Sequence, residues 1–175
     1  SEGAWSATYA FATRKFDGNF DFLFFGDPQI GSSGNVSKDG AGWADTLNVA
    51  LGLEHEAIAA YQVGAESGLL KPDVLKVAVG FQSDHKQHRD ILVKTIDQLG
   101  GSAVADMKHK FPVEKLKNQA DVLRFALGLE MGAASAYLST IPGFENRDLA
   151  KAAASIMGVE TQHVAILKSA LGEQP

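Results

Sequence analysis

Apolar residues recur every three or four positions from Trp43 almost to the end of the chain, which is the period of an amphipathic α-helix. Glycine and proline residues interrupt this pattern and divide it into separate helices. The predicted helices cover residues 43–69, 72–99, 118–141 and 145–171. Helices of this length are typical of an antiparallel bundle. The longest connection, residues 100–117, follows the second helix and is short for crossing the full length of a bundle.

Residues 1–42 carry a different pattern. Apolar and polar residues alternate in AWSATYAFAT, and a turn at residues 17–19 leads to an apolar run at residues 20–26. This order predicts a β-hairpin, and the turn-forming residues 27–42 predict a loop after it. The chain is therefore predicted to be a mainly α protein. It has a hairpin and loop extension in residues 1–42 and an antiparallel four-helix bundle in residues 43–175.

The second predicted strand contains the apolar segment FDFLFF, which needs a surface to cover it. A two-stranded hairpin is barely stable alone, and an apolar edge strand tends to pair with another chain. The sequence therefore favours a homo-oligomer in which the N-terminal hairpin contributes a contact.

The composition narrows the possible partners. The net charge is −5 and the basic residues are scattered, so no nucleic-acid surface is expected. No apolar run approaches the roughly 20 residues of a membrane span, so no membrane insertion is expected. The absence of cysteine excludes disulfides and thiolate ligands. The chain begins at Ser1 rather than Met, so a periplasmic or exported location after signal removal and a cytoplasmic location both stay open.

A thirteen-residue phrase occurs twice in the helical region. Residues 49–61 read VALGLEHEAIAAY and residues 125–137 read FALGLEMGAASAY, with eight identical positions. A second, looser repeat pairs HKQHRDIL at 85–92 with ETQHVAIL at 160–167. The duplication predicts two helix pairs, each with a Glu on its first helix and Glu/His-x-x-His on its second.

Polar side chains interrupt the apolar stripes of all four predicted helices near their middles. They are Glu54, His85, His88, Glu130, Glu160 and His163. In the second and fourth helices the two polar residues stand three positions apart, which places both on one face. Three buried carboxylates would repel one another and be costly without compensation.

Two divalent cations would neutralise these carboxylates, and a carboxylate–imidazole set suits iron, manganese or zinc. The pattern therefore predicts a metal site. The alternative is a metal-free bundle, a structural or assembly protein, in which Glu and His side chains satisfy one another's hydrogen bonds.

Residues 45–171 resemble the ferritin-like superfamily of di-iron carboxylate proteins, through LGLEHEAIAAY and the paired Glu/His-x-x-His segments. They are especially similar to small bacterial ferritin-like proteins that often follow a twin-arginine export signal. The resemblance implies a ferritin-like bundle with iron or manganese, and oxidation of the metal or reduction of dioxygen or peroxide. The ligands it implies are Glu54, His88, Glu130, Glu160 and His163.

The chain departs from the family pattern at position 85, where His stands in place of Glu. An imidazole there removes one negative charge and the carboxylate's ability to bridge two metals. The site is therefore expected to hold two ions asymmetrically, one ion, or none. Asp84 and His55 lie one position off the inward stripe, where a small helix rotation would bring either into the site.

Residues 2–48 resemble the start of a calcineurin-like metallophosphoesterase, through the stretch FLFFGDPQIGSSG. The resemblance implies that Asp27 corresponds to the first metal ligand of such an enzyme. The later phosphoesterase motifs are absent, and one Asp does not make a two-metal phosphate-cleaving site. Residues 1–42 are therefore interpreted as a fragment of that fold, and phosphoesterase activity is not expected.

Overall fold

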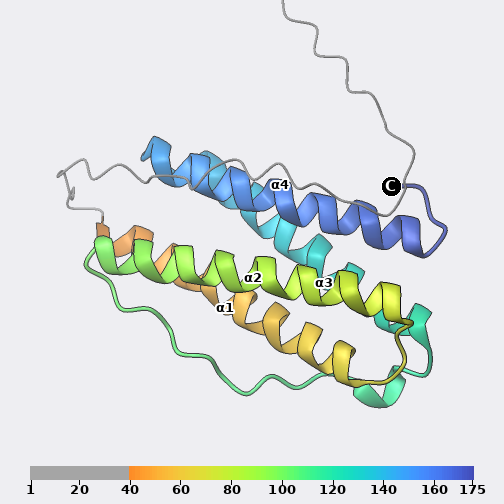
Figure 1. The fold of residues 1–175 in the computed structure, drawn as a ribbon. Coiled ribbons are helices and arrows are strands. Elements are labelled where there is room, and N and C mark those ends of the chain that lie inside the picture. Colours follow the sequence, from red (N-terminus) through yellow and green to blue (C-terminus); the bar gives the residue numbers. More distant parts are fainter. Residues whose placement is uncertain (1–39) are drawn as a thin grey trace, which may run out of the picture.

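The computed structural model describes residues 40–175, which form four long helices and two short 3-10 turns (Figure 1). The long helices are α1 (Gly40–Glu66), α2 (Pro72–Gln98), α3 (Gln119–Thr140) and α4 (Arg147–Ala170). The turns are η1 (Val113–Lys115) and η2 (Ile141–Gly143). The four predicted helices are thus confirmed, each end to within three residues.

Residues 1–39 lie outside the described residues, and so does the predicted hairpin with its phosphoesterase-like stretch. The division of the chain at residue 42 and the homo-oligomer built through the hairpin therefore stay predictions. None of the described helices is long and apolar enough to cross a membrane.

Side chains at the helix ends explain where α3 and α4 begin. The side chain of Asn118 accepts a hydrogen bond from the backbone N–H of Asp121, and Asn146 accepts from Asp148 and Leu149. Such caps satisfy N–H groups that have no partner within the helix. Each capping residue stands directly before its helix, so the local sequence determines both starting points.

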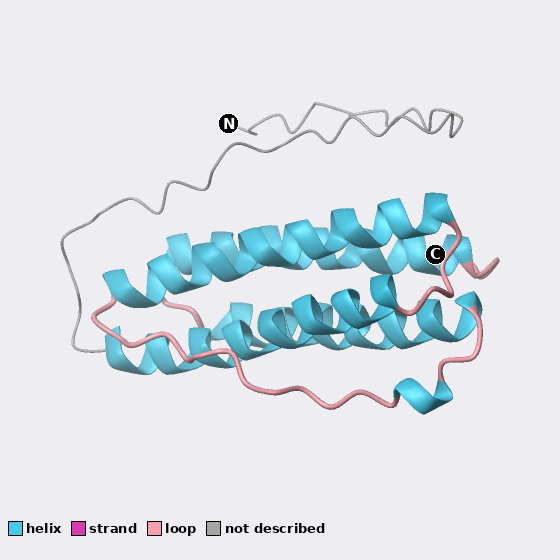
Figure 2. Cartoon of the chain, turned by 60° about the horizontal axis from the view of Figure 1, so that its bottom comes forward, coloured by secondary structure: helices cyan, strands magenta, loops and turns pink. Residues whose placement is uncertain are grey.

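The connection between α2 and α3 runs along the whole length of the bundle (Figure 2). An extended chain advances about 3.3 Å per residue, so residues 99–118 reach farther than the roughly 40 Å length of α1. The expectation that this connection is short for a full crossing is therefore wrong, because the chain is extended. The crossover makes α3 parallel to α2 and antiparallel to α1.

The start of the crossover is fixed to α1. The side-chain amide of Asn48 donates to the carbonyl of Ser102 over 2.9 Å, and its oxygen accepts from the N–H of Val104 over 2.8 Å. Gly101 packs so closely that a Cβ atom built on it would stand 2.5 Å from the Cβ of Ala44. These contacts hold the extended segment against the first helix.

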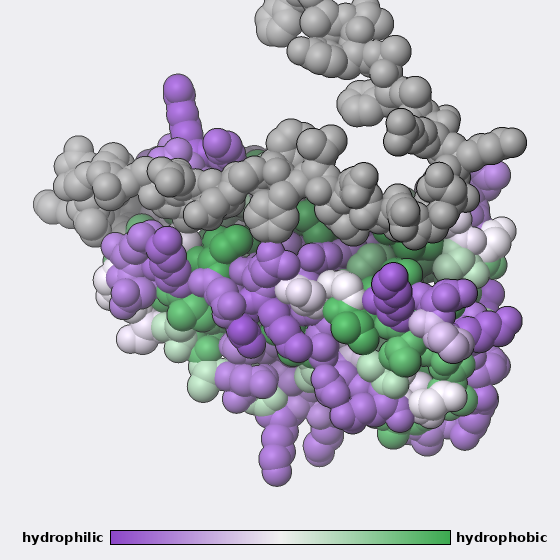
Figure 3. Space-filling model, viewed as in Figure 1, coloured by the Kyte–Doolittle hydropathy of each residue, from purple (hydrophilic) through white to green (hydrophobic). Residues whose placement is uncertain are grey.

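Helix α1 packs against α2, and α3 against α4. Apolar side chains line both ends of the bundle interior. One end contains Leu51 and Ile96, and the other contains Phe81 and Leu123. Hydrophilic residues cover most of the face seen in Figure 3, with apolar residues in scattered patches. The polar residues that interrupt the apolar stripes lie in the layer between the two apolar ends.

Replacing Gly101 with alanine is expected to lower the free energy of unfolding by about 1–3 kcal/mol, because the added methyl group overlaps Ala44 and Ile96. The matched control is Gly52→Ala in α1, where a Cβ meets nothing within 4 Å. That change is expected to stabilise by up to about 1 kcal/mol through helix propensity. Chemical denaturation measures both. Equal stabilities for the two variants would contradict the close packing of the crossover.

Candidate metal centre

The six side chains predicted from the sequence come together in the middle of the bundle. They are Glu54 from α1, His85 and His88 from α2, Glu130 from α3, and Glu160 and His163 from α4. All six are buried, with exposed fractions between 0% for Glu160 and 6% for His88. Their ligand atoms form two overlapping groups of four, and within each group these atoms lie within 4.8 Å of one another.

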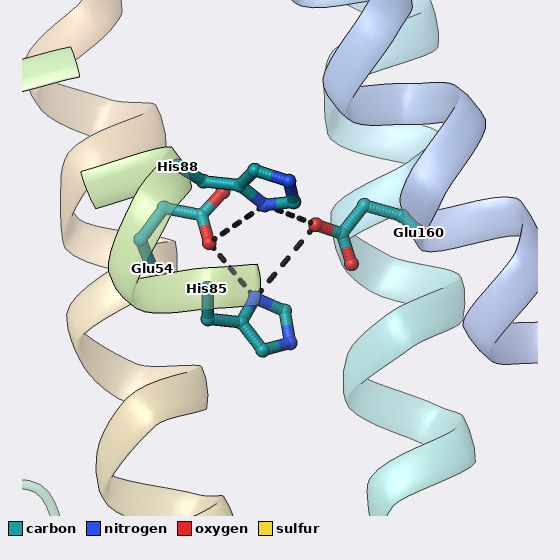
Figure 4. Close-up of side chains that lie close together, drawn as sticks. All are labelled: Glu54, His85, His88 and Glu160. Atoms are coloured by element: carbon teal, nitrogen blue, oxygen red, sulfur yellow. Dashed lines mark hydrogen bonds and ion pairs between the residues drawn. The ribbon is translucent and has the colours of Figure 1, made fainter. Parts of the chain in front are cut away.

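The first group combines Glu54, His85, His88 and Glu160 (Figure 4). Nδ1 of His88 lies 3.0 Å from Oε1 of Glu160 and 3.5 Å from Oε2 of Glu54. Nδ1 of His85 lies 2.8 Å from the same Glu54 oxygen and 3.7 Å from Oε1 of Glu160. Two carboxylate oxygens and two imidazole nitrogens therefore face one common point between α1, α2 and α4.

The second group combines His85, Glu130, Glu160 and His163. Nδ1 of His163 lies 3.3 Å from Oε1 of Glu130 and 3.7 Å from Oε2 of Glu160. Nε2 of His85 lies 3.2 Å from the same oxygen of Glu130. This group therefore repeats the donor set of the first one between α2, α3 and α4.

His85 and Glu160 belong to both groups. The carboxylate of Glu160 turns one oxygen toward His88 and the other toward His163. The ring of His85 likewise turns Nδ1 toward the first group and Nε2 toward the second. The imidazole of His85 cannot bridge two metal ions as a carboxylate does, but it contacts both groups, one through each ring nitrogen.

Two buried tyrosines link the two repeats of the sequence. The hydroxyl of Tyr137 donates to Oε1 of Glu54 over 2.6 Å, and the hydroxyl of Tyr61 donates to Oε1 of Glu130. Each tyrosine therefore holds the glutamate of the other repeat, whereas the sequence places it beside the glutamate of its own repeat. Burial raises the pKa of both hydroxyls well above 10, helped by the negative glutamates, so both stay protonated donors.

The two residues considered as substitute ligands lie outside both groups. Asp84 stands behind the second group, where its carboxylate accepts from Nε2 of His163 at 3.3 Å and orients the ring. Phe81 stacks on the same ring with centroids 3.8 Å apart. His55 faces the crossover instead, with Nε2 3.4 Å from the carbonyl of Val104.

The electrostatics of the cluster depend on burial and on mutual compensation. Burial alone would lower the pKa of His85, but hydrogen bonds to Glu130 and Glu54 outweigh it and raise that pKa to about 10. Burial would also lower the pKa of His88, but its close contacts with the carboxylates of Glu160 and Glu54 outweigh burial and raise that pKa to about 9. Burial opposes ionisation of Glu54 as well, but its histidine partners lower its pKa to about 2.

Two glutamates of the second group respond in opposite directions. Burial opposes ionisation of Glu130, but its close contacts with His163 and His85 outweigh burial and hold its pKa far below the usual range. Burial raises the pKa of Glu160, and its contact with Glu130 adds to that rise. Burial would lower the pKa of His163, but its contacts with Asp84 and Glu130 raise that pKa to about 11. Without a metal ion, His85, His88 and His163 are therefore protonated and balance the carboxylates, and the shared Glu160 is the carboxylate least able to keep a negative charge.

Several buried polar atoms of the cluster have no hydrogen-bond partner among the described residues. They are Nδ1 of His88 and His163, Oε2 of Glu130 and both carboxylate oxygens of Glu160. Some lie close to each other, such as His88 Nδ1 and Glu160 Oε1 at 3.0 Å, yet without hydrogen-bond orientation. Buried atoms of this kind are normally paired, so their common direction fits coordination of metal ions. The donor types, carboxylate oxygen and imidazole nitrogen, suit iron, manganese or zinc.

A four-helix bundle with a buried Glu/His cluster that is consistent with a dimetal site defines the class of protein. The chain belongs to the ferritin-like domain family, whose model matches residues 42–173. The family resemblance inferred from the repeated ALGLE phrase and the His-x-x-His segment is therefore confirmed.

Among solved structures, the chain is similar to a conserved hypothetical protein, Rv2844, from Mycobacterium tuberculosis. The TM-score is 0.68 at 24% sequence identity, and the match covers 77% of this chain and 94% of that one. This likeness supports the fold. No curated protein matches the chain.

The metal-free protein is expected to lose stability as the pH rises above 6.5, the ordinary pKa of histidine. The folded-state pKa values of His88 and His85 are raised to about 9 and about 10. Their stabilising effect is therefore fully present below 6.5 and is lost as the pH rises through these values. Denaturant unfolding in the presence of a chelator, at a series of pH values from neutral to alkaline, measures this decrease.

The variant His88→Gln serves as the control, because it is expected to show a shallower decrease over the same pH range. A metal-free protein whose stability stays constant or increases across that range would show that these histidines are not held protonated by the glutamates.

Proposed function

We propose that this chain binds two transition-metal ions, iron or manganese, in the two ligand groups, and that the metal centre reacts with dioxygen or peroxide. The observation that carries the proposal is the pair of overlapping donor groups that share Glu160 and His85. Iron or manganese held by such groups would supply one-electron chemistry for oxidation of the metal itself or for reduction of dioxygen or peroxide. The family membership over residues 42–173 supports the same class of site.

The residues have distinct roles in this proposal. Glu54 and His88 would serve the first ion, and Glu130 and His163 the second, while Glu160 offers one oxygen to each group. The six donors are almost completely buried, so bulk water is kept out of the centre.

The tyrosine hydroxyls fix the outer oxygens of two ligands. Because Tyr137 donates to Oε1 of Glu54 and Tyr61 to Oε1 of Glu130, each carboxylate is held in one orientation. Each hydroxyl also keeps a proton next to a carboxylate oxygen. These contacts hold the two ligand carboxylates in place before any metal binds.

The histidine at position 85 makes the centre asymmetric in charge. Three carboxylates face two cations, whereas a glutamate at this position would have given four. Fewer negative charges weaken the affinity for a second divalent ion. We therefore expect stepwise binding, with one ion held more tightly than the other.

Loading the purified protein with Fe(II) or Mn(II) tests the proposal. Elemental analysis after removal of free metal is expected to find about two ions per chain, the number of donor groups. Anomalous diffraction at the iron and manganese edges would place them between α1, α2 and α4 and between α2, α3 and α4. The loaded protein should consume dioxygen or peroxide faster than the chelated protein. Metal content well below one ion per chain under these conditions would reject the proposal.

A metal-free scaffold is the second candidate function. It is favoured by the hydrogen bonds of His85 to Glu54 and Glu130, since these satisfy part of the buried cluster without any ion. The two candidate functions predict different results when metal binding is measured at several pH values. If metal binds, it displaces protons from the histidines, so its affinity increases with pH. A scaffold shows no such linkage because it takes up no metal.

The variants Glu160→Gln and Glu54→Gln should differ in metal stoichiometry. Glu160 belongs to both donor groups, so losing its charge is expected to weaken the binding of both ions. The expected loss of affinity is tenfold or more, roughly the cost of removing a charged hydrogen-bonding partner. Glu54 belongs only to the first group, so its variant is expected to keep the ion of the second group. Elemental analysis of the loaded variants measures the ratio.

Glu56→Gln is the matched control, because Glu56 lies on α1 like Glu54 but outside both groups. This variant should bind metal like the parent protein. Retention of two tightly bound ions by Glu160→Gln would contradict its shared role.

A further inference from the structure

A cavity of about 460 Å³ lies beside the candidate metal centre. Its lining residues come from one end of the bundle, where α1 ends and α2 begins; Figure 1 shows these helix ends. All four helices line it, and several of the lining residues are small, among them Ala60, Ala78 and Ala126. We propose that this cavity binds an uncharged molecule with a mainly hydrocarbon body. This proposal goes beyond the proposed function and does not depend on it, because no metal is needed to form the cavity.

The size of the cavity fits a ligand site. Ligand pockets commonly measure about 300–1,000 Å³ and often lie between the helices of bundles. A dry apolar cavity of about 150 Å³ already binds benzene, and this one has about three times that volume. A molecule larger than benzene, such as a hydrocarbon chain of medium length, would therefore fill it.

The inner wall of the cavity is fixed by contacts with two side chains of the buried cluster, Glu130 and His163. Tyr61 lines the cavity and is held by its hydrogen bond to Glu130. Phe81 lines it as well and is held by stacking on His163. Because these rings are tied to buried ligand residues, the wall does not collapse into the empty space. A bound molecule would contact both rings directly.

The internal duplication places an equivalent cavity at the other end of the bundle. It has a volume of about 180 Å³ and is lined by Tyr137 and Ile156, which correspond to Tyr61 and Phe81 in the sequence repeat. Phe144 also lines this second cavity and packs against Trp43, with ring centroids 5.0 Å apart.

The turns beside the two cavities carry different residues. Phe144 of the turn before α4 lines the second cavity. The turn before α2 contains Gly68, whose φ of 69° is a backbone conformation that strongly favours glycine, and Leu70, which lines the first cavity. An aromatic ring therefore lines the smaller cavity at its turn, and an aliphatic side chain lines the larger one.

The lining decides the chemistry of the ligand. No basic side chain is found among the described residues that line the cavity, so a carboxylate or phosphate group would have no counterion. The acidic residue among them, Asp73, is exposed and lies with the exposed Ser169 on the open side. The buried part offers only apolar groups and the engaged hydroxyl of Tyr61. An uncharged ligand with at most a neutral polar end at the mouth matches this surface.

Titration of the full chain with straight-chain alcohols from hexanol to dodecanol, followed by calorimetry, tests the proposal. Affinity is expected to increase about fourfold per methylene group, the usual gain for burying one, and to stop increasing at the length that fills the cavity. Dodecanoate, which carries a charge on a similar chain, is expected to bind at least tenfold more weakly than dodecanol because its carboxylate has no partner. Absence of saturable binding, or affinity that increases without a limit in chain length, would overturn the proposal.

Two filling variants keep the test specific. Ala126→Phe and Ala78→Phe each place a ring in the cavity and are expected to move the limiting chain length to shorter alcohols. Ala154→Phe adds the same ring at an exposed position of α4 outside the cavity and should bind like the parent protein. Circular dichroism confirms that each variant is folded. Unchanged binding by a folded filling variant would overturn the proposal.

Sedimentation in the presence of dodecanol tests a second occupant. If the alcohol dissociates an assembly of the chain, the cavity is filled by another copy and the proposal is wrong. An assembly state that does not change on saturation with the alcohol supports a small-molecule site.

Discussion

The structure depends on the mutual compensation of three carboxylates and three imidazoles at the centre of the bundle. Each helix contributes at least one of these groups, and all six are buried. Removing one partner leaves a charged group in the core without compensation, which costs about 3–5 kcal/mol. The four helices are therefore fixed in register by polar contacts, and the apolar ends of the bundle add stability around that register.

The same compensation links structure to chemistry. The histidines hold their protons because the glutamates are ionised, and two glutamates stay ionised because the histidines are protonated. The donor atoms already face common points, so in the proposed function a divalent cation would take the place of these protons. A metal-free and a metal-loaded form of this bundle are thus expected to share one fold, and they differ in what carries the positive charge.

The sequence was sufficient to predict the helices and the level of the site, because helical periodicity fixes which residues face inward. It could not predict which groups meet. The pairing of Tyr61 with Glu130 joins residues 69 positions apart, and the repeat itself suggested no such exchange between halves. Asp84 illustrates the same limit: periodicity placed it near the site, but only the packing of α4 against α2 puts it behind His163. The prediction for the crossover was wrong because the number of residues alone does not show that the connection is extended.

The sequence repeat accounts for part of the regularity of the interior. The two tyrosine–glutamate pairs and the tyrosines that line the two cavities occupy matching positions of the repeat. The repeat is broken within the buried cluster, where His85 stands opposite Glu160 and removes one negative charge from the centre. Packing alone does not require a histidine there, because a glutamate occupies the matching position in α4. In the proposed function this position sets the charge of the metal centre, and a departure from the local pattern is expected where function constrains the sequence.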